Sequence, residues 1–453
     1  TPMCKNKACN LLTIVSVFRI CHFYNYSSNT GVTKMKLSSV VVTLILTVGV
    51  PYYIYTPLPA AIEEPLKLML LDAFFRAMLQ VGDLCQYLGL SHHITMIRGP
   101  TLGLGSPGEM AGGQGGRVRV SDVDFDRVPV RVYEPPAAGG GEGGLRRAVM
   151  FYHGGGWALG TTSKCMGSYD VLCRQMSDEL NAVVVSVEYR LAPEVHFPVQ
   201  YEDCLAAAKH FLEPGILGKL SVDPQRVAVS GDSAGGNLAA AVAQQISVDD
   251  SVSVKFSVQA LIYPVLQGLD LNTPSHQQNH NIPMLHRFMM ARFWLLYLGV
   301  DTSLHPILLS PSLLHHPSIP PSVRSHLNWT TLLPAKHIKH YKPVGMETGS
   351  WEVTGQEGDL LPGLLDVRAA PLLAEQGVLG RTPRAYILTC EYDVLRDDGL
   401  MYTRRLQDAG VAVSSHHYDD GFHGALSFAH SPFYFDVGKR MIRGYMDWLQ
   451  ENL

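Results

Sequence analysis

Two short apolar runs, each followed at once by a glycine-rich turn, constrain the fold of this 453-residue chain more than any other feature. Ala148–Tyr152 leads into His153–Trp157, and Arg226–Ser230 leads into Gly231–Gly235. Short apolar runs bounded by turn signals are typical of strands buried on both faces, as in parallel sheets covered by helices. The small-residue run Gly236–Ala243 is typical of a helix that packs closely on a sheet. The sequence therefore predicts an α/β fold with a mostly parallel central sheet flanked by helices.

The second turn fits the pattern G-x-S-x-G, in which a sharp strand-to-helix turn lifts a serine hydroxyl clear of the sheet. Its central residue, Ser233, is therefore the candidate nucleophile. Attack by serine on a carbonyl creates an oxyanion, which must be met by fixed N–H donors. The glycine run in His153–Trp157 suits that task, because a backbone without Cβ atoms can approach the charge closely. Together the two turns indicate acyl-transfer chemistry.

A nucleophilic serine needs a general base, and the base needs a carboxylate that orients it. Three acids, Asp393, Asp397 and Asp398, follow the strand-like run Arg384–Cys390. Asp397 and Asp398 fall in what resembles the first turn of a helix, where acidic residues are favoured for electrostatic reasons. Asp393 lies nearest the end of the strand, where catalytic groups of α/β sheets are placed. Asp393 is therefore the preferred orienting acid.

Several histidines compete for the role of base after the strand-like stretch Val411–Val413. His416 and His417 lie in a polar run and are interpreted as solvated surface residues. His430 precedes Ser-Pro and is interpreted as a loop residue. His423 is flanked by glycines in a setting that suits an exposed turn, and it follows serine and acid in the order expected for such a fold. His423 is therefore the preferred base.

These motifs allow a family resemblance to be stated. Together they resemble the hormone-sensitive-lipase-like branch of the α/β-hydrolases, and the similarity extends from about Met35 to the C-terminal Leu453. The strings that carry it are His153–Trp157, Glu188–Glu194, Gly231–Asn237, Asp393–Asp397 and Gly421–Gly424.

The resemblance implies an α/β-hydrolase fold in which Ser233 is the nucleophile, Asp393 the orienting acid and His423 the general base. It also implies hydrolysis of carboxylic esters and arylacetamides of small lipophilic substrates through an acyl-enzyme. A neutral-lipid lipase (for triacylglycerol or cholesteryl esters) is an alternative, and a non-catalytic binding protein on the same scaffold is another that the presence of His423 disfavours. The oxyanion hole is expected from Gly154, Gly155 and the N–H of Ala234.

The N-terminal region carries a second strong signal. From Leu37 to Ile62 there is no charged residue, and about twenty apolar residues can cross a bilayer as a helix. Two lysines precede the stretch and two glutamates follow it, which places the N-terminus in the cytoplasm. Residues 35–57 are therefore expected to form an uncleaved signal anchor of a single-pass type II protein in the endoplasmic reticulum membrane. Residues 1–34 are interpreted as an extension from upstream translation or from an error in the gene model.

Two features bear on the lumenal placement. Asn328-Trp329-Thr330 is an N-glycosylation acceptor, which is used only on the lumenal side; Asn25 heads a second match that this topology leaves in the cytoplasm. A disulfide between Cys165 and Cys390 would pin the two catalytic loops together, with Cys173 as the alternative partner.

Composition agrees with one large domain. Residues 58–453 are expected to form the hydrolase, with cap elements at about 62–98 and 266–365, where strand–helix alternation breaks down. The net charge of −4 without a basic cluster argues against nucleic acid as a partner. No metal or organic cofactor is called for, since zinc-like spacings, a P-loop and a dinucleotide-binding fingerprint are all missing from the sequence. The sequence does not predict an oligomeric state.

Overall fold

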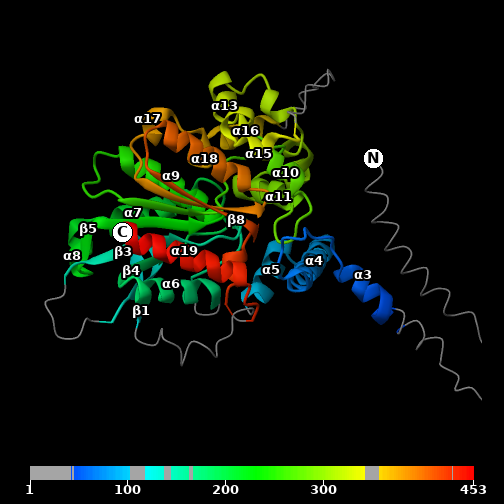
Figure 1. The fold of residues 1–453 in the computed structure, drawn as a ribbon, viewed down its shortest axis with the longest axis horizontal. Coiled ribbons are helices and arrows are strands. Elements are labelled where there is room, and N and C mark those ends of the chain that lie inside the picture. The colour runs from blue at the N-terminus through cyan, green and yellow to red at the C-terminus, as the bar shows by residue number, and fades with distance from the viewer. Residues whose placement is uncertain are drawn as a thin grey trace, which may run out of the picture.

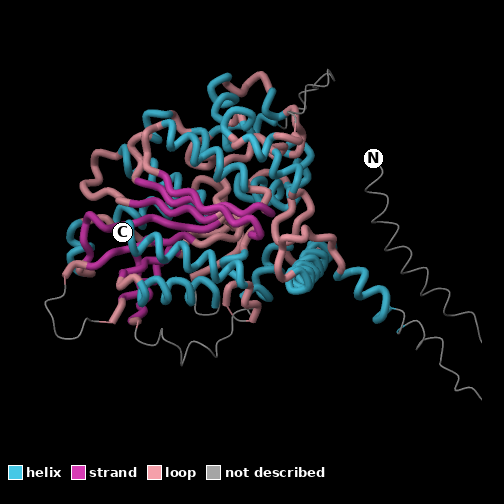
Figure 2. The backbone as a smooth tube through the Cα atoms, viewed as in Figure 1, coloured by secondary structure: helices cyan, strands magenta, loops and turns pink. Residues whose placement is uncertain are grey.

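The computed structural model describes residue 42 and residues 45–102, 118–136, 144–162, 167–341, 357–430 and 432–453. Figure 2 shows its strands gathered in one twisted layer with helices on both sides. Residues 1–34, for which an extension was predicted, lie outside the described part of the chain.

The central layer is an eight-stranded sheet in the order β1-β2-β4-β3-β5-β6-β7-β8. The β1–β2 and β2–β4 pairings are antiparallel, and every other pairing is parallel. The predicted α/β fold with a mostly parallel sheet is therefore confirmed. The strands are β1 (Arg119–Phe125), β2 (Val128–Glu134), β3 (Arg146–Tyr152), β4 (Ala182–Val187), β5 (Val222–Asp232), β6 (Val258–Ile262), β7 (Arg384–Tyr392) and β8 (Val413–Phe422).

Helices cover both faces of the sheet (Figure 1). The alternation of side chains along β3 shows why: Met150 and Tyr152 belong to the core on one face, and Val149 and Phe151 to the core on the other. Helices α7 (Val199–Phe211), α9 (Ala234–Val248) and α18 (Arg396–Asp408) pack on the first face, and α6 (Gly167–Glu179) and α19 (Asp436–Asn452) on the second. Both faces of the central strands are thus buried from solvent, as their continuous apolar sequence predicts.

The remaining helices are short or lie beyond the carboxyl edge of the sheet. They are α3 (Val50–Ile54), α4 (Pro65–Tyr87), α5 (His93–Leu102), α8 (Pro214–Lys219), α10 (Pro274–Gln278), α11 (Arg287–Leu298), α12 (His305–Leu308), α13 (Pro321–His326), α14 (Trp329–Leu332), α15 (Ala335–Ile338), α16 (Glu357–Leu365) and α17 (Gln376–Leu379).

The predicted signal anchor, residues 35–57, falls only partly within the described residues. Its described part forms a short π-helical segment, Ile45–Gly49, followed by α3. Among the helices of the described residues, none combines the length and the apolar character needed to cross a bilayer.

Candidate active site

Ser233 occupies the tight turn between β5 and α9. Its backbone has φ +56° and ψ −118°, a conformation that residues with a side chain rarely adopt. A Cβ at Gly231 would lie 2.4 Å from the backbone of Gly235, and a Cβ at Gly235 would lie 2.0 Å from the carbonyl oxygen of Tyr152. The two glycines of G-x-S-x-G are therefore required because β3, β5 and α9 meet there without room for side chains. Strain of this kind is typical of functional turns.

The three residues predicted for the triad meet in one hydrogen-bonded chain. Ser233 Oγ lies 2.9 Å from His423 Nε2, and His423 Nδ1 lies 2.8 Å from Asp393 Oδ2. Asp393 follows β7 and is fully buried, whereas His423 follows β8 and is 9% exposed. Parallel strands β5, β7 and β8 end at the same edge of the sheet, which is why residues 190 positions apart come into contact.

The loop that carries Asp393 is braced by residues that the sequence motifs did not reveal. Asn279 donates its side-chain N–H groups to the carbonyl oxygens of Glu391, at 2.9 Å, and of Asp393, at 3.0 Å. Ser275 donates to the carbonyl of Val394 at 2.6 Å, and the N–H of Leu395 donates to Asp393 Oδ1 at 2.8 Å. The carboxylate therefore presents Oδ2 to the histidine in a fixed direction. No local pattern marks Asn279, because its partners lie more than a hundred residues away.

The glycine loop differs from expectation at one position. The N–H of Gly154 donates to Asp232 Oδ1 at 2.7 Å, so it is not available to an oxyanion. Gly155 and Gly156 have φ of +109° and +60°, and within the described residues no acceptor takes the N–H of Gly155, Gly156 or Ala234. The prediction is thus wrong for Gly154, while Gly155 and Ala234 keep free donors and Gly156 joins them.

Asp232 is the reason for this shift by one residue. It is buried beside the nucleophile and also accepts a hydrogen bond from the hydroxyl of Tyr169 at 3.1 Å. Burial away from water raises the pKa of Asp232 to about 6, against the opposing effect of these hydrogen bonds. Asp232 therefore connects the glycine loop to the tight turn that carries Ser233. The sequence did not predict this role, because the contact depends on how the two turns lie in space.

A cavity of about 640 Å³ opens over Ser233 and His423. Both segments expected to form a cap contribute to its wall: α4 and α5 from the first, and α11 from the second. The side chains of Phe75, Leu79, Met289 and Phe293 make much of the wall apolar. The lining also includes polar side chains: Arg292 contacts both Asp83 and His93, and Arg76 pairs with Asp72.

The competing acids and histidines have other positions. Asp397 and Asp398 begin α18, as expected, but both are fully buried; Asp398 accepts hydrogen bonds from the backbone of Leu266 and Gln267.

His416 and His417 are half-buried in β8, so their interpretation as solvated surface residues is wrong. The strand runs on to Phe422 because its backbone pairs with β7 as far as Tyr392, at the edge of the sheet. His430 lies in the loop after Phe428, as expected.

The cysteines and the glycosylation acceptor can be placed in part. Cys390 is a free thiol in the core, where it contacts the Gly421 position, and Cys173 is also free. Neither bridge considered for Cys390 is therefore present, because its side chain points into the packing between the sheet and α19; Cys165 lies outside the described residues. Asn328 is exposed, and the Thr330 hydroxyl donates to its side-chain oxygen at 2.7 Å. Cys85 and Cys204 are free as well.

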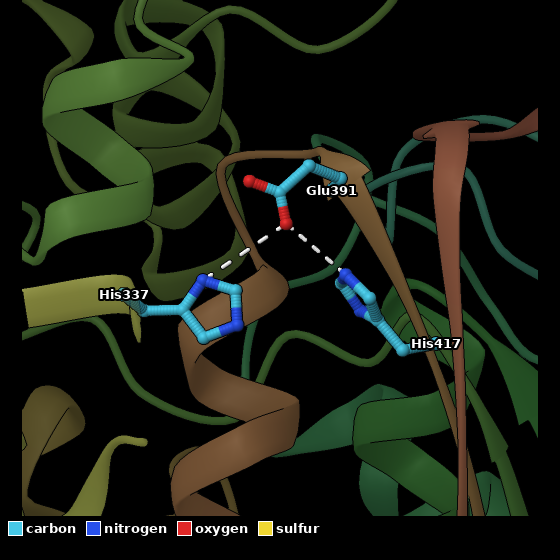
Figure 3. A group of neighbouring side chains, drawn as sticks. All are labelled: His337, Glu391 and His417. Carbon is cyan, nitrogen blue, oxygen red and sulfur yellow. Dashed lines mark hydrogen bonds and ion pairs between the residues drawn. The ribbon is translucent and has the colours of Figure 1, made fainter. Parts of the chain in front are cut away.

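One further cluster could hold a metal ion. Figure 3 shows His337, Glu391 and His417 turned toward one another from three separate elements. Glu391 lies on β7, the strand that leads into the Asp393 loop, but the cluster contributes no atom to the hydrogen-bonded chain of Ser233, His423 and Asp393.

Comparison with known proteins settles the family. A family model described as alpha/beta hydrolase fold matches residues 149–323 and 359–427, which include Ser233, Asp393 and His423. The chain belongs to the α/β-hydrolase family. This agrees with the resemblance drawn from its motifs.

The chain also has full-length relatives. It is 47% identical to neutral cholesterol ester hydrolase 1 of Bos taurus over 423 residues, 92% of this chain and 100% of that protein. It is 44% identical to arylacetamide deacetylase of Oryctolagus cuniculus over 412 residues, 90% of this chain and 99% of that protein. Longer strings such as Asp366–Ala374 already predict a resemblance to arylacetamide deacetylase, and the comparison confirms it. Among solved structures, an esterase of Pyrobaculum calidifontis superposes with a TM-score of 0.57 at 27% identity, covering 82% of this chain and 97% of that one.

Proposed function

We propose that this α/β-hydrolase cleaves carboxylic esters, and amides of the arylacetamide kind, through an acyl-enzyme on Ser233. The observation that carries the proposal is the hydrogen-bonded chain from Ser233 through His423 to Asp393, set at the floor of an apolar cavity. A binding protein on the same scaffold would need neither of these two hydrogen bonds. The non-catalytic alternative is therefore disfavoured.

In the first half of the reaction, His423 Nε2 accepts the proton of the Ser233 hydroxyl as Oγ attacks the substrate carbonyl carbon. Asp393, held by Leu395 and Asn279, keeps the imidazole oriented and stabilises its positive charge. The carbonyl oxygen becomes an oxyanion, which the unpaired N–H groups of Gly155, Gly156 and Ala234 receive. The N-terminus of α9 adds a favourable electrostatic contribution at the same point.

The first half ends when this oxyanion collapses: the bond from the carbonyl carbon to the leaving oxygen or nitrogen breaks, His423 gives its proton to the departing alcohol or amine, and the acyl group stays on Ser233. The second half hydrolyses this acyl-enzyme. Water then enters, and His423 accepts a proton from it as it attacks the acyl carbonyl. The second oxyanion occupies the same donors, and its collapse releases the acid and restores Ser233. Every step uses groups of this chain, substrate and water, with no cofactor required.

The cavity supports a lipophilic substrate. Its volume falls within the range of small-molecule pockets, and its wall is mostly hydrocarbon. The names of two relatives point to two substrate classes, arylacetamides and cholesteryl esters. Small lipophilic esters and amides are the first proposal, and neutral lipid esters the second; the higher identity to the cholesterol ester hydrolase favours testing both.

A membrane anchor in residues 35–57 is part of the proposal, with the hydrolase on the lumenal side of the endoplasmic reticulum. The uncharged stretch Leu37–Ile62 and the flanking charges support this topology. The exposed Asn328 side chain is accessible to a glycan. Loss of about one glycan mass on endoglycosidase treatment, absent in Asn328→Gln, would support the topology, and digestion of the intact chain by protease outside sealed microsomes would contradict it.

The hydrolase activity is tested with full-length protein in detergent on p-nitrophenyl acetate, an arylacetamide and an emulsified cholesteryl ester. Ser233→Ala is expected to reduce turnover of every accepted substrate by about 10³-fold or more. Ser247→Ala is the matched control in the same helix, since that hydroxyl only bonds the carbonyl of Ala243. Wild-type rates in Ser233→Ala would refute the proposed chemistry.

A further inference from the structure

Three metal-ligating side chains converge outside the catalytic chain of hydrogen bonds (Figure 3). His337 lies on α15 in the cap, Glu391 near the end of β7 and His417 on β8. Glu391 Oε2 is 3.0 Å from His417 Nε2 and 3.9 Å from His337 Nδ1. The ligand atoms of all three residues lie within 4.8 Å of one another. Sequence spacing could not reveal this set, because its members come from three distant segments.

Two of the three groups, His417 and Glu391, are each oriented by a second hydrogen-bond partner. Thr389 Oγ1 lies 2.9 Å from His417 Nδ1, which leaves Nε2 directed at the centre. Arg396 donates to Glu391 Oε1 at 2.8 Å, which leaves Oε2 for the centre. Outer partners of this kind fix the ligands of protein metal sites and are part of their design.

We propose that His337, Glu391 and His417 bind one divalent cation of the zinc type. Two imidazoles and one carboxylate are ligands that zinc accepts, at about 2.0–2.2 Å each. Ligands at that distance in a tetrahedron are about 3.4 Å apart, so the His337 side chain has to move toward the other two ligands, whose atoms now lie within 4.8 Å of its own. Asp419, 3.5 Å from His417 Nε2 and largely exposed, or a water molecule, completes the coordination.

Such an ion would join the cap to the sheet. It would tie α15 to β7 and β8 at a point two residues before Asp393, and so hold the cap against the strand that leads to the catalytic acid. The alternative is that the three side chains form only ion pairs and hydrogen bonds with one another and bind no metal ion. It predicts no binding of zinc.

The test uses full-length protein, freed of metal with a chelator and titrated with zinc chloride by calorimetry and thermal unfolding. One equivalent is expected to bind and to raise the melting temperature. His337→Ala and His417→Ala should each weaken binding by about 100-fold or more. His340→Ala, an exposed histidine of the same segment, is the matched control and should bind as wild type.

Cobalt(II) gives a second measurement that does not depend on stability. Wild type should show the d–d absorption of a tetrahedral cobalt site, and His337→Ala should lose it. Absence of zinc and cobalt binding in wild type, or binding that survives both histidine substitutions, would overturn the proposal.

A second inference rests on a different observation, the two faces of α4. On its inner face, Phe75, Leu79 and Asp83 line the active-site cavity. Its outer face is a stripe of large apolar side chains that are 40–64% exposed. The stripe, called here the outer stripe, consists of Leu66, Leu70, Phe74, Val81 and Leu84.

The spacing of the outer stripe, by three, four or seven residues, places its members on one side of the helix. The helix has 23 residues, and the stripe, from Leu66 to Leu84, is about 27 Å long at 1.5 Å per residue. Single exposed apolar residues are ordinary, but a continuous patch of this length marks an interaction surface.

The segment that precedes α4 indicates what the outer stripe contacts. Leu46, Val48 and Tyr52 are 59–77% exposed, and Figure 1 shows α3 and α4 at the same end of the molecule. Arg76 joins the two helices, because it donates to the carbonyl oxygen of Tyr53 at 2.8 Å and lies over that tyrosine ring. The outer stripe therefore continues the apolar segment proposed as a membrane anchor.

We infer that the outer stripe lies in the surface of the lipid bilayer. This inference rests on the proposed anchor and hydrolase activity. An amphipathic helix buries such a face about 5–10 Å into the boundary between headgroups and acyl chains. Because the opposite face of α4 forms the cavity wall, only one helix would separate the membrane from the active site, and substrates dissolved in the membrane would reach it without crossing water.

The surface is tested in phosphatidylcholine vesicles with a polarity-sensitive fluorophore on full-length protein in which Cys4, Cys9, Cys21, Cys85 and Cys165 are replaced by serine. Labels on Leu70→Cys and Leu84→Cys should be quenched by spin-labelled lipid. A label on Val123→Cys, an exposed apolar residue of β1, is the control and should not be quenched. Unquenched labels at positions 70 and 84, or cross-linking of two copies through them, would overturn the inference.

Kinetics separate this inference from the proposed function. The double variant Leu70→Glu, Leu84→Glu should lower hydrolysis of a cholesteryl ester held in vesicles by about 10-fold and leave hydrolysis of soluble p-nitrophenyl acetate unchanged. Equal loss for both substrates, or for neither, would contradict a role in membrane access. If wild type hydrolyses no ester at all, the proposed function fails, while the quenching result still decides where the stripe lies.

Discussion

The backbone N–H of Gly154 donates to Asp232 Oδ1 at 2.7 Å, and this bond joins the glycine loop to the turn that carries the nucleophile. The two motifs are thus held in a fixed relative position, because the residue before Ser233 binds the loop that faces the oxyanion. The bond also explains why the donors are displaced by one residue, to Gly155 and Gly156.

Removing the Asp232 carboxylate tests this coupling. Asp232→Ala removes the carboxylate acceptor of the Tyr169 hydroxyl and leaves the Gly154 N–H to the Tyr169 hydroxyl oxygen, 3.0 Å away. Loss of a buried hydrogen-bond partner costs about 1–3 kcal/mol. We expect kcat for p-nitrophenyl acetate to fall about 10–100-fold with little change in KM. A kcat equal to that of wild type in folded protein would show that the loop holds its position without Asp232.

A methyl group at Gly156 tests the donor loop directly. Its Cβ would lie 2.5 Å from the ring of Phe293, and its φ of +60° is unfavourable for alanine. Gly156→Ala is expected to move the loop and reduce kcat by about 10²-fold, the scale for loss of one oxyanion donor. Gly215→Ala is the control, since a Cβ there meets nothing within 4 Å. Equal kinetics for the two variants would show that the loop accepts a Cβ at position 156 without moving.

The hydrogen bonds from Asn279 should matter for rate and not for substrate binding. Asn279→Ala frees the carbonyl oxygens of Glu391 and Asp393, so the carboxylate no longer holds His423 in one orientation. We expect kcat to fall about 10-fold at unchanged KM. Lowering the pH of the assay should not restore kcat. Asn452→Ala, far from the site in α19, should behave as wild type. A change confined to KM would instead place Asn279 in substrate binding.

His276 predicts a pH dependence of stability. It is fully buried on α10, and burial lowers its pKa from 6.5 to about 3. Below pH 6.5 the unfolded chain therefore binds a proton that the folded chain refuses. The stability that the neutral ring contributes is complete above pH 6.5 and is lost as the pH falls.

Between pH 7 and pH 5 this group alone should cost about 2 kcal/mol of unfolding free energy. His276→Leu is expected to lose that much less stability than wild type over the same interval, measured by denaturant unfolding at both pH values. Parallel curves for the two proteins would show that His276 is protonated in the folded state or exposed by local opening.

The local motifs of this chain predicted the parts of the site that depend on short stretches of sequence. Ser233, Asp393 and His423 follow from strand, turn and order, because each sits where a strand ends at one edge of a parallel sheet. Asn279 could not be predicted, since its role is a contact across more than a hundred residues. His417 was misjudged because β8 is an edge strand, and polar residues there resemble a loop. The free Cys390 shows the same limit, because sequence does not tell which way a side chain points from a strand.

The central claim is that Ser233 forms a covalent acyl-enzyme, and one measurement tests it most directly. Full-length protein is treated with diethyl p-nitrophenyl phosphate, which phosphorylates an activated serine, and the modified peptide is identified by mass spectrometry. The account predicts one adduct on Ser233, formed at least 100-fold more slowly in His423→Ala. No adduct, or an adduct on another residue at the rate seen in wild type, would contradict it.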